Sequence, residues 1–317
     1  MLNGHFNRWI ILFILVFSTF HLSNAQKIDD LIEVSLLSDV EKIKSGESAW
    51  LILQIDLEPK WHAYWKTAGQ TGFPTTIEWV VPDGVELGEV LFPSPMLYQF
   101  QDLVSYVHED TFYLLTRLEI EPDAVFDQDI ISLTAQFSTL ICDEGNCIPF
   151  NKELVFEIPV SPETIKSKVH SEKVQLALAE LPQSPPVGGQ ISALIQDDSI
   201  VLSFEHSSLN NLDLAGFKFF PEGDFITHGE RQKFQKNGEG RILVQLSLDS
   251  FPAGFSTPIK GLLNHPQFPQ GWLIDLSVDQ VSYGVTQDKI EVSKSTEILK
   301  VESGFNQLLI MLGLILV

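Results

Sequence analysis

The chain has 317 residues, 44% of them hydrophobic, which is enough for two ordinary domains. Its 42 acidic residues outnumber its 20 basic ones, and the formal net charge at pH 7 is −22. Nucleic acids and anionic lipid surfaces bind basic proteins, so this balance excludes nucleic acid as a partner and disfavours an anionic membrane surface. The composition suits an acidic globular protein outside the cytoplasm.

Residues 1–26 have the pattern of a signal peptide. Arg8 precedes an apolar run over residues 9–20, and Ser23-Asn24-Ala25 is a small-x-small cleavage pattern. A membrane anchor is the alternative, but the apolar run is short for a span of about 20 residues. We expect cleavage after Ala25. Export would place both cysteines of the chain in an oxidising compartment, where a disulfide persists.

Residues 27–160 alternate apolar and polar side chains in short runs, which is typical of half-buried strands. We expect strands near 31–38, 48–57, 75–80, 86–91, 111–120, 130–142 and 147–160. About seven antiparallel strands in this length predict an all-β fold, an immunoglobulin-like β-sandwich.

A helix and a linker are expected over residues 161–189. Ser161 suits an N-cap and Pro162 the first helical position. The apolar residues that follow fall roughly on one helical face: Ile165, Val169, Val174, Leu178 and Leu181. Pro182 would end the helix, and "PQSPPVGG" reads as a linker.

Residues 190–300 return to strand-like alternation, with a hairpin signal at Asn237-Gly238, and predict a second β-sandwich without cysteine. The end of the chain, 308–317, holds nine apolar residues in ten. It is either a short apolar tail or the start of a truncated transmembrane helix over 301–317. We favour the helix, because a soluble protein gains nothing from such an exposed end.

Both cysteines lie in one segment, "STLICDEGNCIPF", over residues 138–150. In the strand before the turn the odd positions are apolar, and after the turn the even positions are. A four-residue loop over 143–146 then pairs Cys142 with Cys147 and matches the apolar positions of both strands, which a slip of one residue would destroy. Both cysteines are therefore expected opposite each other on the outer face of the sheet.

Three interpretations of this pair remain open. A structural disulfide in a non-catalytic binding module is one, although so short a loop constrains the unfolded chain by only about 2 kcal/mol. A Cu(I)-handling thiolate pair is another. We favour thiol–disulfide exchange, because exposed bridges between neighbouring strands tend to be labile. Asp143 and Glu144 disfavour a thiolate at Cys142, so Cys147 is expected to attack first. Zinc is not expected, since it needs four ligands and the eight histidines supply no further ligands at a suitable spacing.

Two aromatic segments precede the cysteines. "WHAYWKTAGQTGFPTTIEW", residues 61–79, reads as a core strand and a turn, with His62 packed rather than ligating, and no Gly-Lys-Ser/Thr follows to make a phosphate loop. In the segment 93–115, Tyr98, Phe100 and Tyr106 are either core residues or a cap over the disulfide, and the sequence alone leaves both open.

Together these segments resemble the N-terminal periplasmic region of DsbD-type protein-disulfide reductases, including the ScsB-like branch. The resemblance lies in residues 61–79, in the "CDEGNCIP" hairpin at 142–149, and in the order signal, sandwich, linker, second β domain and apolar end. It is specific in those two segments and weak in the second domain.

The resemblance implies an immunoglobulin-like redox domain whose catalytic pair is Cys142 and Cys147, with Tyr98, Phe100 and Tyr106 as the cap. It implies a protein-disulfide reductase activity that needs no cofactor beyond the redox-active disulfide. The implied partners are thioredoxin-like periplasmic proteins, bound by mixed disulfide, and the membrane-embedded electron-transfer domain of the full-length protein. The implied location is the periplasm, with attachment to the inner membrane near residue 305.

Overall fold

The computed structural model describes residues 28–196, 198–223, 226–230, 232–248, 258–277 and 281–284. The expected signal peptide (1–26), the expected membrane segment (301–317) and the last part of the expected second domain (285–300) lie outside the described residues. No helix in the described ranges is both long and apolar enough to span a bilayer.

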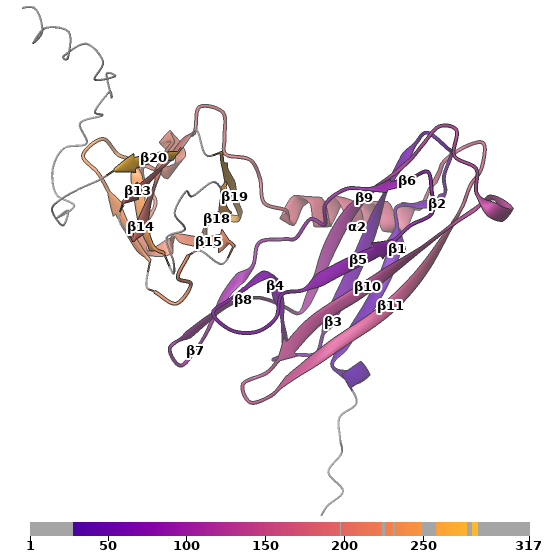
Figure 1. The fold of residues 1–317 in the computed structure, drawn as a ribbon, viewed down its shortest axis with the longest axis horizontal. Coiled ribbons are helices and arrows are strands. Elements are labelled where there is room, and N and C mark those ends of the chain that lie inside the picture. The colour runs from indigo at the N-terminus through magenta and orange to yellow at the C-terminus, as the bar shows by residue number, and fades with distance from the viewer. Residues whose placement is uncertain are drawn as a thin grey trace, which may run out of the picture.

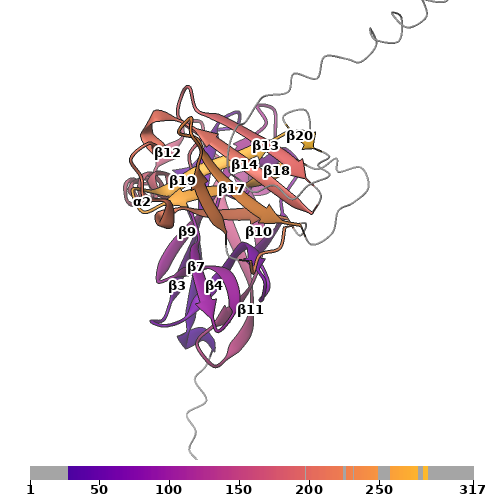
Figure 2. The ribbon, with the colours of Figure 1, turned by 90° about the vertical axis from the view of Figure 1, so that its left-hand side faces the viewer.

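The described chain forms two β-rich lobes (Figure 1). We call residues 28–160 the N-terminal lobe and residues 190–284 the C-terminal lobe. Between them runs α2 (Lys168–Glu180), which lies along the N-terminal lobe (Figure 1). Figure 2 shows the same two lobes from the side, with the C-terminal lobe stacked over one end of the N-terminal lobe.

The N-terminal lobe is a sandwich of two antiparallel sheets around one apolar core. The first sheet has the order β1 (Ile32–Ser38), β3 (Ser48–Leu57), β9 (Thr111–Ile120), β6 (Val85–Leu87). The second has the order β11 (Cys147–Pro159), β10 (Ile130–Cys142), β4 (His62–Gly69), β8 (Leu103–Glu109), β7 (Met96–Phe100), and β5 (Thr76–Val80) also pairs with β10. Short elements complete the lobe: η1 (Ile28–Asp30), β2 (Val40–Lys42) and η2 (Asp127–Asp129). The expected all-β, immunoglobulin-like sandwich is confirmed.

The β10–β11 hairpin has the register that side-chain parity predicts. Cys142 pairs with Cys147, Ala135 with Leu154, and the other expected apolar pairs are also opposite each other: Leu133–Phe156, Ile131–Ile158 and Ile141–Ile148. The odd positions of β10 are buried, because that face of the sheet covers the core.

The helix begins later than expected, and the assignment of Ser161 as its N-cap is wrong. The backbone N–H of Ser161 donates to the carbonyl of Ile43 at 2.8 Å, so the chain still follows a strand edge there. The next residues form β12 (Ile165–Lys166), which pairs with β2. Only at Ser167, the N-cap, is the chain free to turn into α2. Sheet pairing outweighs the local N-cap signal of Ser161 and Pro162.

The C-terminal lobe also has two sheets around an apolar core of its own. One sheet has the order β16 (Lys233–Lys236), β17 (Ile242–Ser247), β14 (Ser199–Glu205), β13 (Gln190–Gln196), β20 (Val281–Gly284). The other has the order β15 (Lys218–Glu222), β18 (Ile259–His265), β19 (Phe268–Leu276), with η3 (Ser207–Leu209) and η4 (Leu214–Gly216) preceding β15. Asn237-Gly238 lies in the β16–β17 turn, as expected. The division into independently folding domains at 160 and 190 stays a prediction.

Candidate redox site

A disulfide between Cys142 and Cys147 closes the turn end of the β10–β11 hairpin. The two Cα atoms are 4.2 Å apart, as expected for residues directly opposite each other in an antiparallel pair. The loop between the cysteines is closed by a 2.9 Å hydrogen bond from the Asp143 N–H to the Asn146 carbonyl.

The Asp143 side chain holds this loop in shape. Its Oδ1 accepts hydrogen bonds from the backbone N–H groups of Gly145 at 2.8 Å and Asn146 at 2.7 Å. The Gly145 hydrogen bond is the main cause that lowers the pKa of Asp143, followed by the one from Asn146. The loop therefore keeps a negative charge beside the disulfide at neutral pH.

The two sulfurs differ in their access to solvent. Cys142 is only 2% exposed, whereas Cys147 is exposed. Cys142 belongs to a small apolar cluster outside the main core, made by Tyr64, Ala68, Val107 and Leu140, with Tyr98 packed against it. Parity correctly put Cys142 on the outer face of the sheet, but side chains from other strands of the same sheet, among them Tyr64 and Tyr98, cover it there. An attacking thiol meets Cys147 first.

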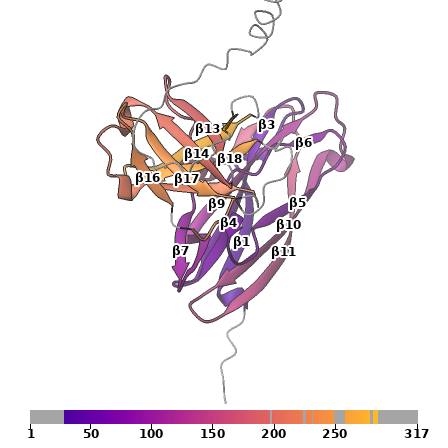
Figure 3. The same ribbon diagram turned by 60° about the vertical axis from the view of Figure 1, so that its left-hand side comes forward.

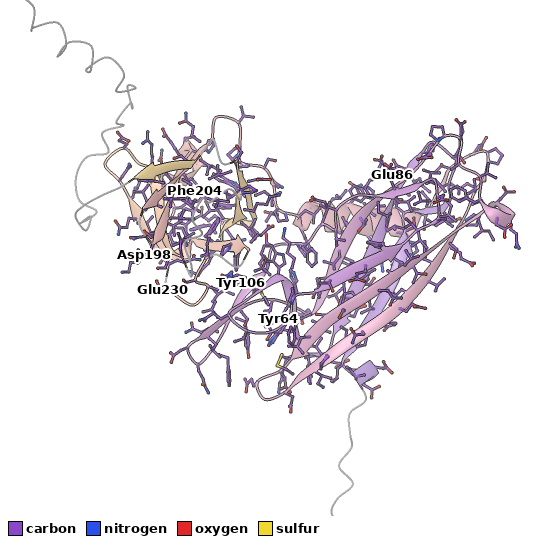
Figure 4. The ribbon with its side chains drawn as sticks, in the orientation of Figure 1. Tyr64, Glu86, Tyr106, Asp198, Phe204 and Glu230 are labelled. Carbon is purple, nitrogen blue, oxygen red and sulfur yellow. A yellow bond between two sulfur atoms is a disulfide. The ribbon has the colours of Figure 1, made fainter. Side chains whose placement is uncertain are left out.

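Tyr64 contacts the buried sulfur directly. Its hydroxyl lies 3.5 Å from Cys142 Sγ, and Figure 4 shows the side chain beside the disulfide. The ring packs so closely on Gly72 that a Cβ there would lie 2.1 Å from it, and Gly72 has a φ of +93°. The Tyr64 carbonyl accepts a hydrogen bond from the Thr75 hydroxyl, which also contacts Thr139 at 2.7 Å. These contacts fix Tyr64 against β10.

His62 and Tyr98 form the next layer. His62 pairs with Cys142 across β4 and β10, and its ring lies 4.3 Å from the ring of Tyr98. Burial lowers the pKa of His62, while Asp143 acts in the opposite direction. Burial is also the main cause that raises the pKa of Tyr98, with Glu144 adding to it. At neutral pH both rings are therefore uncharged.

The structure separates the three residues expected in the cap. Tyr98 lies on the β7–β8 hairpin, which we call the cap hairpin (residues 96–109), and packs against the cysteine cluster. Phe100 is near the hairpin turn and 44% exposed. Tyr106 is 1% exposed and packs on the opposite side, against Trp65 and Phe220. The structure thus brings Tyr98 to the disulfide, and not Tyr106.

The sequence interpretation missed His62 and Tyr64 as neighbours of the disulfide. Their spacing of two residues on one strand was a usable signal, because it puts both on one face. The pairing of β4 with β10 lies too far away in sequence to be inferred from either segment. Within the described ranges, no cluster of three or more histidine, cysteine or carboxylate side chains is arranged to hold a metal ion.

Comparison with known proteins agrees with this geometry. Residues 33–159 match the family model described as "Thiol:disulfide interchange protein DsbD, N-terminal". No curated protein matches the chain.

Two solved structures are similar. The N-terminal periplasmic domain of ScsB from Proteus mirabilis has a TM-score of 0.59 and 15% identity, over 80% of this chain and 96% of that chain, which shows a shared fold. The reduced N-terminal domain of DsbD from Neisseria meningitidis has a TM-score of 0.27 and 13% identity, over 46% of this chain and 97% of that chain. A TM-score this low does not show a shared fold. The family match to the sandwich, which holds the cysteine hairpin, shows that residues 33–159 are a DsbD-type N-terminal domain.

Proposed function

We propose that this protein is the thiol–disulfide exchange module of a periplasmic protein-disulfide reductase, and that it passes electrons through Cys142 and Cys147 to disulfide-bonded partners. The observation that carries the proposal is the unequal exposure of the two sulfurs within a DsbD-type domain. An exposed sulfur backed by a buried one suits a pair in which one cysteine meets the partner and the other resolves the intermediate.

In the reduced protein, the Cys147 thiolate attacks one sulfur of the partner disulfide. The partner S–S bond breaks, one partner sulfur leaves as a thiolate, and a mixed disulfide with Cys147 forms. Cys142 then attacks Cys147 Sγ as a thiolate and releases the second partner sulfur. Two electrons have passed to the partner, and the Cys142–Cys147 disulfide is restored.

The residues around Cys142 suit the resolving step. The Tyr64 hydroxyl, 3.5 Å from Cys142 Sγ, can donate to a thiolate there and stabilise it. Tyr98 packs against the same apolar cluster and has the His62 ring beside it, which helps to exclude water from this sulfur. The cover keeps stray thiols and water away from Cys142 until a partner displaces it.

We further infer that the partners are thioredoxin-like periplasmic proteins and that the electrons arrive from a membrane-embedded domain of a longer protein, attached near residue 305. The family match supports this inference, as does the likeness to a structure described as a periplasmic domain of ScsB. In isolation, the described part of the chain would exchange disulfides without drawing electrons across a membrane.

Trapping of a mixed disulfide tests the proposal. Cys142→Ala leaves the exposed Cys147 without its resolving partner, and this variant, once reduced, should accumulate a mixed disulfide with an oxidised thioredoxin-like protein. Cys147→Ala is the matched control, because the remaining Cys142 is covered. Non-reducing electrophoresis should show much more adduct with Cys142→Ala.

No adduct with either variant would reject exchange. A reduction potential below about −300 mV would instead indicate a structural disulfide. A Cu(I) titration of the reduced pair separates exchange from copper handling, since two thiolates bind Cu(I) well.

A further inference from the structure

The β4–β8 strand pair separates the disulfide from the C-terminal lobe. On β4, Tyr64 packs with Cys142 on one face, whereas the next residue, Trp65, has its ring 6.4 Å from Phe220 of β15. Consecutive residues of a strand point to opposite faces, so the β4–β8 pair forms a single layer between the disulfide and the C-terminal lobe. Figure 4 shows Tyr64 on the side of the sulfurs and Tyr106 on the side of the C-terminal lobe.

Phe220 is the centre of the contact between the lobes. It is 2% exposed and packs with the core of the N-terminal lobe although it comes from the C-terminal lobe, as does Leu262. Its ring meets Tyr106 edge-on, with centroids 5.1 Å apart. The Tyr106 hydroxyl lies 3.1 Å from His228 Nδ1. Tyr106 of the cap hairpin is thus held by two residues of the other lobe.

Polar contacts extend this attachment along the same strands. Lys66 Nζ lies 2.6 Å from Glu222 Oε1, and both side chains are mostly shielded from solvent. Gly229 packs directly on Gln70, where a Cβ would collide with the amide. The side-chain Oε1 of Gln70 in turn accepts a 2.9 Å hydrogen bond from the backbone N–H of Val104. The backbone N–H of Gln70 donates to the Val104 carbonyl, also at 2.9 Å.

The other end of the cap hairpin is attached as well. Ser94, two residues before β7, donates a hydrogen bond from its hydroxyl to the carbonyl of Gln270 in β19. The C-terminal lobe therefore contacts the cap hairpin through Tyr106 of β8 and through the segment just before β7, while the turn has Phe100 and Leu103 exposed. Figures 1 and 3 both show β7 and β4 at the side of the N-terminal lobe that faces the C-terminal lobe.

We propose that the C-terminal lobe positions the cap hairpin over Cys142 and so controls how readily the disulfide reacts, with Phe220 as the main positioning residue. The inference rests on the proposed function only in taking Cys142–Cys147 as the reacting pair. Loosening the interface should leave the disulfide bond intact and let the hairpin open more often. Cys147 is exposed in either case, but an open hairpin lets water reach Cys142, which must leave as a thiolate when Cys147 is attacked.

Reduction of the purified protein by dithiothreitol measures this opening without a biological partner. One dithiothreitol thiolate attacks Cys147 Sγ and Cys142 leaves as a thiolate. The second thiol then closes the oxidised dithiothreitol ring and frees Cys147. Phe220→Ala should react about tenfold faster than the unmodified protein, which corresponds to a shift of about 1.4 kcal/mol toward the open state.

Phe219→Ala is a matched control, because Phe219 is the neighbouring residue of β15, is equally buried, and faces the core of its own lobe. It should destabilise the C-terminal lobe without accelerating reduction to the same extent. Equal acceleration by both variants would mean that loss of lobe stability, rather than the interface, exposes the disulfide, and would overturn the proposal.

Reversing the charges of the Lys66–Glu222 ion pair provides a second test if Phe220→Ala fails to fold. Glu222→Lys and Lys66→Glu each place like charges together and should accelerate reduction, whereas the double variant restores the pair and should return toward the original rate. Folded single variants that react at the original rate would overturn the inference. Exchange with a thioredoxin-like protein, measured in parallel, reports on the proposed function separately, since its absence would not alter the dithiothreitol rates.

Discussion

Tyr64 and Tyr106 lie on neighbouring strands and face opposite sides of one sheet. Tyr64 places its hydroxyl 3.5 Å from Cys142 Sγ, and Tyr106 places its own 3.1 Å from His228. One contact concerns the chemistry of the disulfide, and the other concerns the attachment of the lobes. On each strand, neighbouring residues lie on opposite faces of the sheet. Tyr64 and Val107 lie on the face of the disulfide, whereas the residues next to them in sequence, Trp65 and Tyr106, lie on the face of the C-terminal lobe.

Removing the Tyr64 hydroxyl should slow the exchange reaction. In Tyr64→Phe, Cys142 loses the donor that stabilises it as a leaving thiolate, and a hydrogen bond to a charged group contributes about 1.5–3 kcal/mol. We expect reduction by dithiothreitol to slow roughly tenfold while the melting temperature changes little. Stopped-flow measurement of the rate against pH would check this, and an unchanged rate would show that Tyr64 only packs against the sulfur.

His108 should make the fold sensitive to mild acid. It is buried in β8, stacks on Phe112 with ring centroids 4.5 Å apart, and its Nε2 has no hydrogen-bond partner in the described structure. Burial lowers the pKa of His108 to about 3. Between pH 6.5, the ordinary pKa of histidine, and about pH 3, the unfolded chain binds a proton at His108 that the folded chain does not. Stability therefore falls as the pH drops through this window, by up to about 1.4 kcal/mol per pH unit.

His108→Phe should remove this dependence while keeping the aromatic stack. Urea unfolding at pH 7 and pH 5 should show the variant losing about 2 kcal/mol less than the unmodified protein over that interval. Equal losses in both proteins would show that other groups dominate the acid response.

At the scale of elements, the cap hairpin divides into a covering part and an exposed part. Tyr98 packs on the cysteine cluster, whereas Phe100, two residues later, is 44% exposed. The two aromatic residues therefore differ in what they can contact, although both are on β7.

Two alanine variants should separate these roles. Tyr98→Ala lets water reach Cys142 as it leaves as a thiolate, so reduction by dithiothreitol should accelerate several-fold, while Phe100→Ala should leave that rate unchanged. Phe100→Ala should weaken a different reaction, the exchange with a thioredoxin-like protein, because the exposed turn of the hairpin is available to contact a partner. Equal dithiothreitol rates for Tyr98→Ala and the unmodified protein would contradict the covering role.

The β10–β11 hairpin shows how much of the site follows from local sequence. Its register depends on a four-residue loop and on the period of two, both of which lie within one continuous segment, and the structure reproduces it at every expected pair. The start of α2 does not follow from local sequence in the same way. Ser161 and Pro162 favour a helix locally, but the pairing of the preceding residues with Ile43 holds them in an extended path.

At the scale of the whole molecule, α2 contributes to holding the lobes together. It contacts β9 and β1 of the N-terminal lobe and β19 of the C-terminal lobe. Val174 and Ala177 provide its buried face, packed with Ile52 and Leu115. Of the helix face expected from sequence, Val174 is buried, whereas Val169 is 63% exposed.

The two valines of α2 form a matched pair of substitutions. Val174→Ala should lower the free energy of unfolding by roughly 2 kcal/mol, because it leaves a cavity at the sheet surface. Val169→Ala should change it by less than about 0.5 kcal/mol. Chemical denaturation of both variants would check this, and similar values for the two would mean that α2 is not docked through Val174.

The sequence by itself determined the fold class of the first lobe and the facing pair Cys142–Cys147, because strand periodicity and a short loop are local properties of the chain. Only the tertiary structure decided that Cys142 is covered and Cys147 exposed, since the cover comes from β4 and the cap hairpin, far from the cysteines in sequence. It also decided that Tyr106 faces Phe220 instead of the disulfide. Alternation shows that neighbouring residues of a strand face opposite sides, and the contacts between distant segments determine what lies on each side.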